Sequence, residues 1–206
     1  NSFAIKHDDT LWGWGYHWAN GFLGGSRRDQ SNPVQVWNGN PAENHDWKQT
    51  AVGDNHHVAI KHDGSLWAWG YNGYGQLGQN DVINRSSKVQ IGSNTDWVEC
   101  HSGLHSSYAI NANNQLWVWG FNNYGQLGTG NRTYYSSPVQ IAGSWIIMDA
   151  DEYSVSAINS ANQLFSWGSN NYGQLGDNSR TNRSSPVQEN SGQSWRKVVG
   201  ASSGIS

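Results

Sequence analysis

Apolar and polar residues alternate along much of the chain, most clearly in its aromatic segments. In the segment SLWAWGY, residues 65–71, Trp67 and Trp69 fall on one side of an extended chain and the intervening alanine on the other. This period of two predicts β-strands. Asp-Gly and Asn-Gly pairs separate these segments, and such residues tolerate the positive φ that tight turns require. We therefore expect an all-β chain without helices.

The chain contains four copies of one unit, and this repeat is the main guide to its fold. The aromatic segment recurs at residues 11–25, 66–79, 116–129 and 164–177. A lone tryptophan opens each unit, in steps of 50, 48 and 50 residues, at Trp47, Trp97, Trp145 and Trp195. A period near 50 residues accommodates four strands of about 5–6 residues with their turns. Each unit therefore reads as an opening strand, a second strand, the aromatic third strand and a short fourth strand.

The fold predicted from this repeat is a β-propeller of four-stranded antiparallel blades, and a linear β-solenoid is the alternative. One unit cannot bury its aromatic face alone, so the copies must stack, and radial stacking of such sheets gives a propeller. We place the units at about residues 1–46, 47–96, 97–144 and 145–194. Residues 195–206 are expected to supply the opening strand of a blade that residues 2–8, or sequence beyond this chain, complete.

The order of residues within the unit is distinctive. It reads as an opening Trp, then Gly-x-x-His and Ala-Ile, then Leu-Trp-x-Trp-Gly-x-Asn-x-x-Gly-Gln-Leu-Gly, and a closing Pro-Val. The Gly-Gln-Leu-Gly tetrapeptide is intact at residues 75–78, 125–128 and 173–176. Over nearly the whole chain this pattern resembles the regulator of chromosome condensation repeat, also called the alpha-tubulin suppressor-like repeat.

The resemblance implies a propeller, usually of seven blades, whereas this chain has four units. Three arrangements stay open: part of a larger propeller, a compact four-bladed ring, or a half-ring completed by a second copy. The founding member of the family is a guanine-nucleotide exchange factor for a small GTPase and also binds chromatin, and many relatives are general protein-interaction modules. No exchange-specific loop matches this chain, so the resemblance favours an interaction module.

Composition and charge narrow the classes of partner. Of the 206 residues 13% are charged, and the net charge of −3 argues against a protein that coats nucleic acid. The 13 Trp and 9 Tyr supply the apolar mass of a core. No run reaches the roughly 18 apolar residues of a membrane helix, and residues 1–30 lack the layout of a secretory signal. The single cysteine, Cys100, excludes an internal disulfide.

Several local groups have ligand chemistry, and for each a structural role is the stronger interpretation. The Gly-Gln-Leu-Gly loop lacks the Lys-Ser/Thr and the helix of a phosphate-binding loop, so its glutamine is expected to bond the backbone. Two groups hold metal-ligand types without the spacing of a known site: Cys100, His101 and His105, and Asp149, Asp151 and Glu152. We predict no metal, no cofactor and no catalytic residues, because no motif announces a nucleophile with its base.

The arginines provide the candidate partner-binding surface. Six of the seven lie between the Gly-Gln-Leu-Gly position and the closing strand: Arg27, Arg28, Arg85, Arg132, Arg180 and Arg183. Because repetition along the chain becomes repetition around a ring, we expect a positive collar on one rim that binds the acidic groups of a partner. Tyr134 and Tyr135 lie beside Arg132 and extend this surface. The alternative is that these arginines bond groups of their own loops.

The predicted function is a non-enzymatic protein-interaction scaffold that binds a protein partner through its rim loops. The first alternative is an extracellular carbohydrate-binding or structural protein, since the chain is poor in charge and its loops carry tyrosines. A guanine-nucleotide exchange factor is a third and weaker alternative, because only fold analogy supports it. A homo-oligomer is expected if a second chain closes the ring, and no feature signals specific binding to nucleic acid.

Overall fold

The computed structural model describes residues 2–15, 29–36, 45–189 and 192–199, and within these residues all regular secondary structure is β. The strands form four antiparallel sheets. The first sheet contains β1 (Ser2–Ile5), β2 (Leu11–Gly15) and β3 (Gln30–Gln35). The second contains β4 (Trp47–Val52), β5 (His56–Lys61), β6 (Leu66–Gly70) and β7 (Arg85–Gln90). The third contains β8 (Trp97–Ser102), β9 (Ser106–Asn111), β10 (Leu116–Gly120) and β11 (Tyr135–Ile141). The fourth contains β12 (Trp145–Ala150), β13 (Ser154–Asn159), β14 (Leu164–Gly168) and β15 (Arg183–Gln188).

Each third strand ends in a register shift at its glycine. In the second sheet the pairing of β6 with β7 shifts between Ala68 and Gly70, and the other three sheets show the equivalent shift. Gly70 has a φ of +108°, and a Cβ there would lie 2.5 Å from the carbonyl oxygen of Asn55. Only glycine fits such a close approach at positive φ. The Trp-Gly step of the repeat thus turns the chain out of the sheet into the following loop.

The core lies between neighbouring sheets, where the tryptophan that precedes the last glycine of β6, β10 and β14 is buried. Trp69, Trp119 and Trp167 are at most 1% exposed. Trp119 packs in one cluster with Leu77 of the preceding repeat, and Trp167 packs in the next cluster with Leu127. A large aromatic buries roughly 150–250 Å², so these residues carry much of the hydrophobic stabilisation. Each sheet therefore depends on its neighbour for a core.

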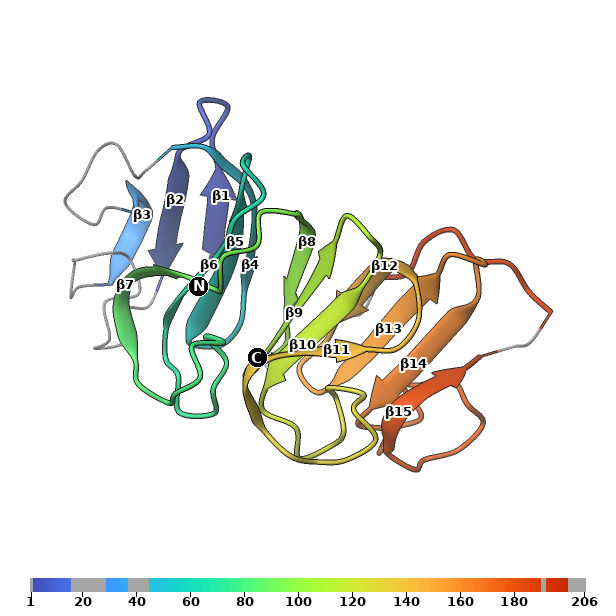
Figure 1. Ribbon diagram of the computed structural model, residues 1–206. Helices are drawn as coiled ribbons and strands as arrows, with labels where there is room; N and C mark the ends of the chain where they lie inside the picture. Colours follow the sequence, from blue (N-terminus) through green and yellow to red (C-terminus); the bar gives the residue numbers. More distant parts are fainter. Residues whose placement is uncertain (1, 16–28, 37–44, 190–191, 200–206) are drawn as a thin grey trace.

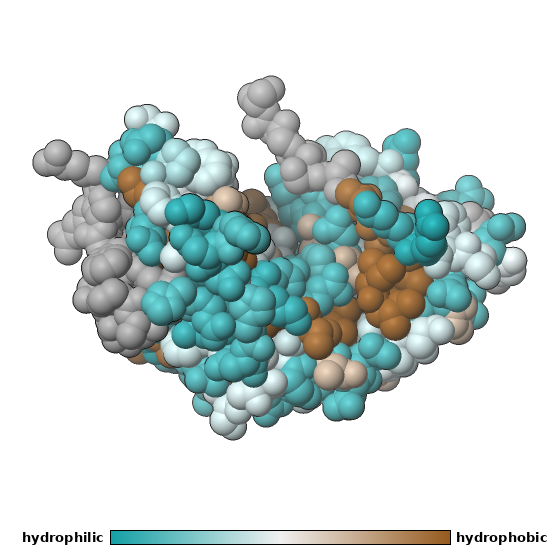
Figure 2. Space-filling view, turned by 90° about the horizontal axis from the view of Figure 1, so that it is seen from above, coloured by the Kyte–Doolittle hydropathy of each residue, from teal (hydrophilic) through white to brown (hydrophobic). Residues whose placement is uncertain are grey.

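The four sheets stand side by side as an arc (Figure 1). The opening strand β8 contacts both β4 and β12, as expected of strands on the inner side of the arc. Seen along the arc axis, the molecule is hollowed between its two ends (Figure 2). This radial arrangement is the predicted propeller architecture. The first sheet has three strands because the chain enters it at the second strand of the unit.

The predicted strand at 195–200 is not formed in residues 195–199, and β1 pairs with β2 alone among the described strands. The segment that begins at Trp195 nevertheless starts as the other units do, because the backbone N–H of Trp195 donates to the carbonyl of Asn162 at 2.8 Å. The same bond opens the earlier units, from Trp47, Trp97 and Trp145 to Asp9, Gly64 and Asn114. The completion of a blade by residues 195–206 and residues 2–8, or by sequence beyond this chain, stays a prediction.

Candidate partner-binding rim

One rim of the arc carries both the first turn and the long loop of each unit. Because the strands are antiparallel, the connection between the first and second strands and that between the third and fourth strands leave the sheet at the same end. These connections project together at the lower edge of the view in Figure 1. We call this edge the loop rim, and it comprises residues 53–55, 71–84, 103–105, 121–134, 151–153 and 169–182.

The Gly-Gln-Leu-Gly loops hold their own shape through their glutamines, as predicted. The side-chain oxygen of Gln76 accepts the backbone N–H of Tyr74 at 2.9 Å. Gln126 and Gln174 make the same bond at 3.1 and 3.0 Å. An asparagine that opens each loop also accepts the N–H of the buried leucine, as Asn72 does from Leu77 at 2.9 Å. These bonds make each loop a preformed support for its outward side chains.

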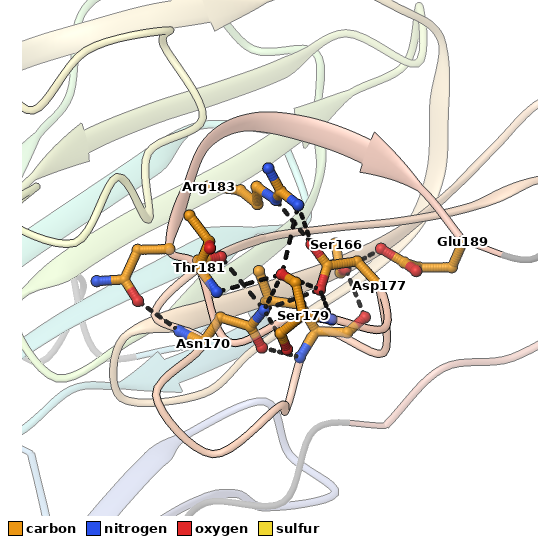
Figure 3. A network of polar contacts seen from close by, with 9 residues as sticks. Ser166, Asn170, Asp177, Ser179, Thr181, Arg183 and Glu189 are labelled. Carbon is orange, nitrogen blue, oxygen red and sulfur yellow. Dashed lines mark hydrogen bonds and ion pairs between the residues drawn. The ribbon is translucent and has the colours of Figure 1, made fainter.

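The arginines of the predicted collar fall into two structural classes. Arg85 donates to the Asp81 carboxylate at 2.6 Å and to the carbonyl of Ile83 at 2.7 Å. Arg183 contacts the Asp177 carboxylate at 2.6 Å, inside the polar network of Figure 3. Both arginines stand three residues before the closing Pro-Val position and start the fourth strand of their sheet. They bond their own loops, which is the structural alternative weighed for the collar.

The network around Asp177 shows how strongly such a loop is tied. Its carboxylate accepts from the Asn170 amide, from the backbone and hydroxyl of Ser179, and from Arg183. These bonds lower the pKa of Asp177 to about 2, the largest effect coming from Ser179. The carboxylate therefore stays charged and holds the loop together.

The arginines six residues before Pro-Val are different. Arg132 and Arg180 are exposed and have no hydrogen bond or ion pair within the described part of the chain. Arg27 and Arg28 lie outside the described residues. Tyr135 occupies the position of Arg85 in its unit, is half-buried, and accepts a hydrogen bond from the Asn131 amide at 2.9 Å. Of the predicted site residues that are described, Arg132, Arg180 and Tyr134 therefore remain turned to solvent.

Tyr134 belongs to a continuous group of rings that crosses three sheets. We call it the aromatic strip, and its members are Tyr71, Tyr74, His105, Phe121, Tyr124, Tyr134 and Tyr153. Neighbouring ring centroids lie between 4.7 Å, for Tyr124 and Tyr153, and 6.3 Å. Tyr134 is 38% exposed, and Phe121 beneath it is 9% exposed. The strip thus has a buried base and an accessible edge.

The aromatic strip is uncharged at neutral pH. Burial lowers the pKa of His105, so its imidazole stays neutral. Burial also raises the pKa of Tyr134 and of Tyr153. On the same rim, the first turns of three units line an open hollow of about 210 Å³, with Asp54 and Glu152 among its lining residues. The rim is therefore apolar at its centre and carries both signs of charge around it.

Of the seven members of the strip, the sequence analysis selected only Tyr134 as part of a binding surface. It did not select Tyr71, Tyr74, His105, Phe121, Tyr124 or Tyr153. A signal was present, because Tyr71 and Phe121 both follow the Trp-Gly step of their units. His105 and Tyr153 both stand directly before a second strand. What the sequence did not indicate is that these two kinds of position meet across the boundary between units.

The residues considered as metal ligands point to different places. Cys100 is 1% exposed, and burial raises the pKa of its thiol. His101 follows on the other face of β8, 3.1 Å from Glu99 and 3.8 Å from Asp149, whereas His105 lies in the aromatic strip. Within the described residues, no three His, Cys, Asp or Glu side chains are grouped to hold a metal ion. No helix there is long and apolar enough to cross a membrane.

Comparison with known proteins identifies the repeat. The family model described as the Regulator of chromosome condensation (RCC1) repeat matches residues 63–110, 113–147 and 162–206, and a second model of this repeat matches residues 47–76. The chain belongs to the RCC1-repeat family. Its repeat units carry the aromatic third strand and the Gly-Gln-Leu-Gly loop described above.

Two curated RCC1-repeat relatives match about one third of the chain. The X-linked retinitis pigmentosa GTPase regulator homolog of Caenorhabditis elegans is 35% identical over 78 residues, which are 38% of this chain and 5% of that protein. The mitochondrial RCC1 domain-containing protein RUG3 of Arabidopsis thaliana is 40% identical over 76 residues, which are 36% of this chain and 16% of that protein. The matched segment is a small part of either relative.

Solved structures share the fold over nearly all of the chain. Human WBSCR16 superposes with a TM-score of 0.79 at 20% identity, covering 96% of this chain and 52% of that one. Prp20p of Saccharomyces cerevisiae gives a TM-score of 0.76 at 18% identity, covering 88% and 46%. The fold is therefore that of RCC1-type β-propellers, and the four sheets span about half the length of these chains.

Proposed function

We propose that this chain is a non-enzymatic interaction scaffold that binds a protein partner through the aromatic strip and Arg132 on the loop rim. The observation that carries the proposal is the strip itself. Tyr134 is 38% exposed above a buried Phe121, and the exposed Arg132 precedes it by two residues. Aromatic residues and arginine are the types most enriched where protein interfaces gain their binding energy.

The construction of the loops supports a role in binding. The backbone beneath the strip is held by the glutamine and asparagine bonds, so a partner would find the rings already ordered and little entropy would be lost. Arg85 is occupied by Asp81, whereas Arg132 is free to meet a carboxylate of the partner. An acidic group facing Arg132, beside apolar groups facing Tyr134, is the partner chemistry that fits this edge.

One of the solved relatives, yeast Prp20, is a protein binder by the descriptions of its structures. The Prp20p structure is described with its binding to Gsp1p and histones, and yeast RCC1 is described bound to Kap60. The name of the Caenorhabditis elegans relative describes a GTPase regulator. For the present chain these relatives support a protein partner as a class, without identifying it.

The buried polar groups support a structural rather than a catalytic role. His56 and Ser107 form a serine–histidine pair, 2.9 Å apart, but both are 0% exposed. The Ser107 hydroxyl donates to the carbonyl of Gln76, which joins two sheets. Burial lowers the pKa of His56 to about 3 and raises that of the Cys100 thiol. A nucleophile needs access to substrate and an activated form, and these groups have neither.

Quantitative affinity capture from extracts of the source cells tests the proposal. The immobilised chain is compared with the double variant Arg132→Ala, Tyr134→Ser and with a control, Ser93→Ala, Asn94→Ala. The control residues are exposed and lie in the connection between β7 and β8, on the opposite rim. We expect specific proteins whose recovery falls at least tenfold with the rim variant and is unchanged with the control. Equal recovery with all three would refute the proposal.

Two further assays separate the alternative functions. A glycan array on which binding is abolished by the rim variant would assign the strip to sugars instead of a protein. A nucleotide-release assay with small GTPases is expected to show the uncatalysed rate, because the proposed scaffold only binds. Acceleration of release by the parent chain would replace the scaffold with an exchange factor.

A further inference from the structure

The long loop of the second unit carries two adjacent aliphatic residues in contact with water, Val82 and Ile83. They are 59% and 62% exposed. Single exposed apolar residues are common on protein surfaces and need no explanation. Two neighbouring β-branched residues, each more than half exposed, form a small apolar patch that is stabilised when a partner covers it. We call Val82 and Ile83 the aliphatic pair.

The repeat shows that the fold does not require apolar residues at these two positions. In the third and fourth units the same positions hold an arginine followed by a threonine, Arg132-Thr133 and Arg180-Thr181. All four of these residues are exposed. The long loops on both sides of the third unit are described, so exposure is a property of the position and not of a missing neighbour. The aliphatic pair is therefore a departure of the second unit that packing does not explain.

The loop holds the aliphatic pair in a fixed shape. The Asp81 carboxylate accepts the backbone N–H of Ile83 at 2.9 Å and pairs with Arg85 at 2.6 Å. Arg85 also donates to the carbonyl of Ile83 at 2.7 Å. These bonds lower the pKa of Asp81, the largest effect coming from the N–H of Ile83, so the carboxylate stays charged. Because the pair is already ordered, covering it costs little conformational entropy.

The aliphatic pair is tied to the aromatic strip through Asn72, which lies between Tyr71 and Tyr74 in the chain. The Asn72 amide donates to the carbonyl and to the carboxylate of Asp81 at 3.0 and 2.9 Å. Its backbone N–H donates to the side-chain oxygen of Asn84 at 2.8 Å. The residues on both sides of the pair are thus bonded to the segment that carries two rings of the strip. A partner that covers those rings meets the aliphatic pair on the same loop.

The charges around the aliphatic pair favour a protein over a membrane as the covering partner. A membrane-binding loop places several basic residues beside its apolar ones, where they meet anionic headgroups. Between Tyr71 and Arg85 the chain has one arginine and no lysine, and this Arg85 is paired with Asp81. The free cation of the surface is Arg132 on the next loop, and a single guanidinium suits a carboxylate of a protein.

We propose that the aliphatic pair inserts into an apolar pocket of the protein that the aromatic strip binds, while Arg132 meets a carboxylate beside that pocket. This inference rests on the proposed scaffold function and adds the chemistry of the partner. Covering the pair removes two β-branched side chains from water, and the polar Arg-Thr pairs of the third and fourth units cannot replace this contribution. The second unit thereby makes a contact that the other units with a described loop do not.

Calorimetric titration tests this contact with the proteins whose recovery in the affinity capture depends on Arg132 and Tyr134, each produced in pure form. The parent chain is compared with the double variant Val82→Arg, Ile83→Thr, which introduces the pair that two other units carry at the same positions. We expect the Kd to rise about tenfold or more. The control Ser93→Ala, Asn94→Ala should leave the Kd unchanged, and thermal melts of all three chains should coincide.

Two further measurements separate loss of contact from other effects of the substitutions. Val82→Ser, Ile83→Ser removes the apolar groups without adding a charge and should weaken binding to a similar extent. Replacing Val82 with the photoreactive residue p-benzoylphenylalanine should give a covalent crosslink to the same protein on irradiation. The same replacement at Asn94, on the opposite rim, should give none.

The outcomes distinguish this inference from the scaffold function on which it rests. If both variants of the aliphatic pair bind as the parent does, the pair lies outside the interface and the inference is overturned, while the strip keeps its role. If the capture finds no protein that depends on Arg132 and Tyr134, the scaffold function fails and the inference with it. Binding of the parent to vesicles of phosphatidylcholine and phosphatidylserine, abolished by Val82→Ser, Ile83→Ser, would assign the pair to a membrane and overturn the protein pocket.

Discussion

Replacing Gly75 and Gly173 with alanine separates two losses of folding stability. One comes from the backbone conformation, and the other comes from crowding between sheets. The two glycines occupy the same position in their units and have almost the same φ, +81° and +79°. At either site, alanine in this backbone conformation lowers the free energy of unfolding by roughly 1–2 kcal/mol. Only at Gly75 does the new Cβ also overlap the next sheet, 2.5 Å from the Cα of Ser136.

Crowding adds about 1–3 kcal/mol, because the neighbour is backbone and cannot rotate away. We therefore expect Gly75→Ala to lower the free energy of unfolding by about 2–5 kcal/mol and Gly173→Ala by about 1–2 kcal/mol. Gly125→Ala should behave like Gly75→Ala, since its Cβ would lie 2.6 Å from the Cα of Ser184.

Urea unfolding followed by tryptophan fluorescence measures these differences in the free energy of unfolding. The variants are compared by the shift of the urea concentration at the unfolding midpoint, with the same m-value for all of them. Gly92→Ala reports the cost of positive φ alone, because Gly92 has open space around it. Equal losses for Gly75→Ala and Gly173→Ala would show that the second and third sheets are not held at the distance described, and would refute the reasoning.

Three further predictions concern buried and paired side chains. Burial lowers the pKa of His56 to about 3, so below about pH 6.5 the unfolded chain binds a proton that the folded chain does not, and the free energy of unfolding decreases as the pH is lowered. His56→Gln should therefore reduce the slope of unfolding free energy against pH by roughly 1 kcal/mol per pH unit, as measured by urea titrations between pH 7 and pH 5. Cys100 should react with an aromatic disulfide reagent only after unfolding, since its thiol is buried and its pKa raised; rapid reaction under native conditions would contradict this. Arg85→Ala should lower the unfolding free energy by about 1 kcal/mol because Asp81 loses its ion pair, whereas Arg132→Ala should leave it unchanged, as thermal melts of both variants would show.

The local structure followed from the sequence because each local feature has a local cause. The alternation around Trp67 and Trp69 indicates a strand whatever surrounds it. The repeat of that strand at about 50 residues implies stacked sheets, since one sheet cannot bury its own tryptophans. The glutamine of the Gly-Gln-Leu-Gly loop was predicted to bond the backbone, and in the structure it accepts the N–H of the tyrosine two residues before it.

The candidate site was predicted only in part, because its members come together through contacts between units. Counting along the chain placed Arg85 and Arg132 in one collar, yet Arg85 is used by Asp81 in its own loop and Arg132 is not. The acidic residue four positions before Arg85 was a readable sign of this pairing. No such sign joins Tyr74 to Phe121, which meet across a sheet boundary.

The sequence by itself determined the strands and their order within each sheet, because periodicity and glycine placement act over a few residues. Only the tertiary structure decided that the sheets stack radially and that rings from three sheets form one strip. Those outcomes depend on contacts across sheet boundaries, which join residues that lie far apart in the sequence.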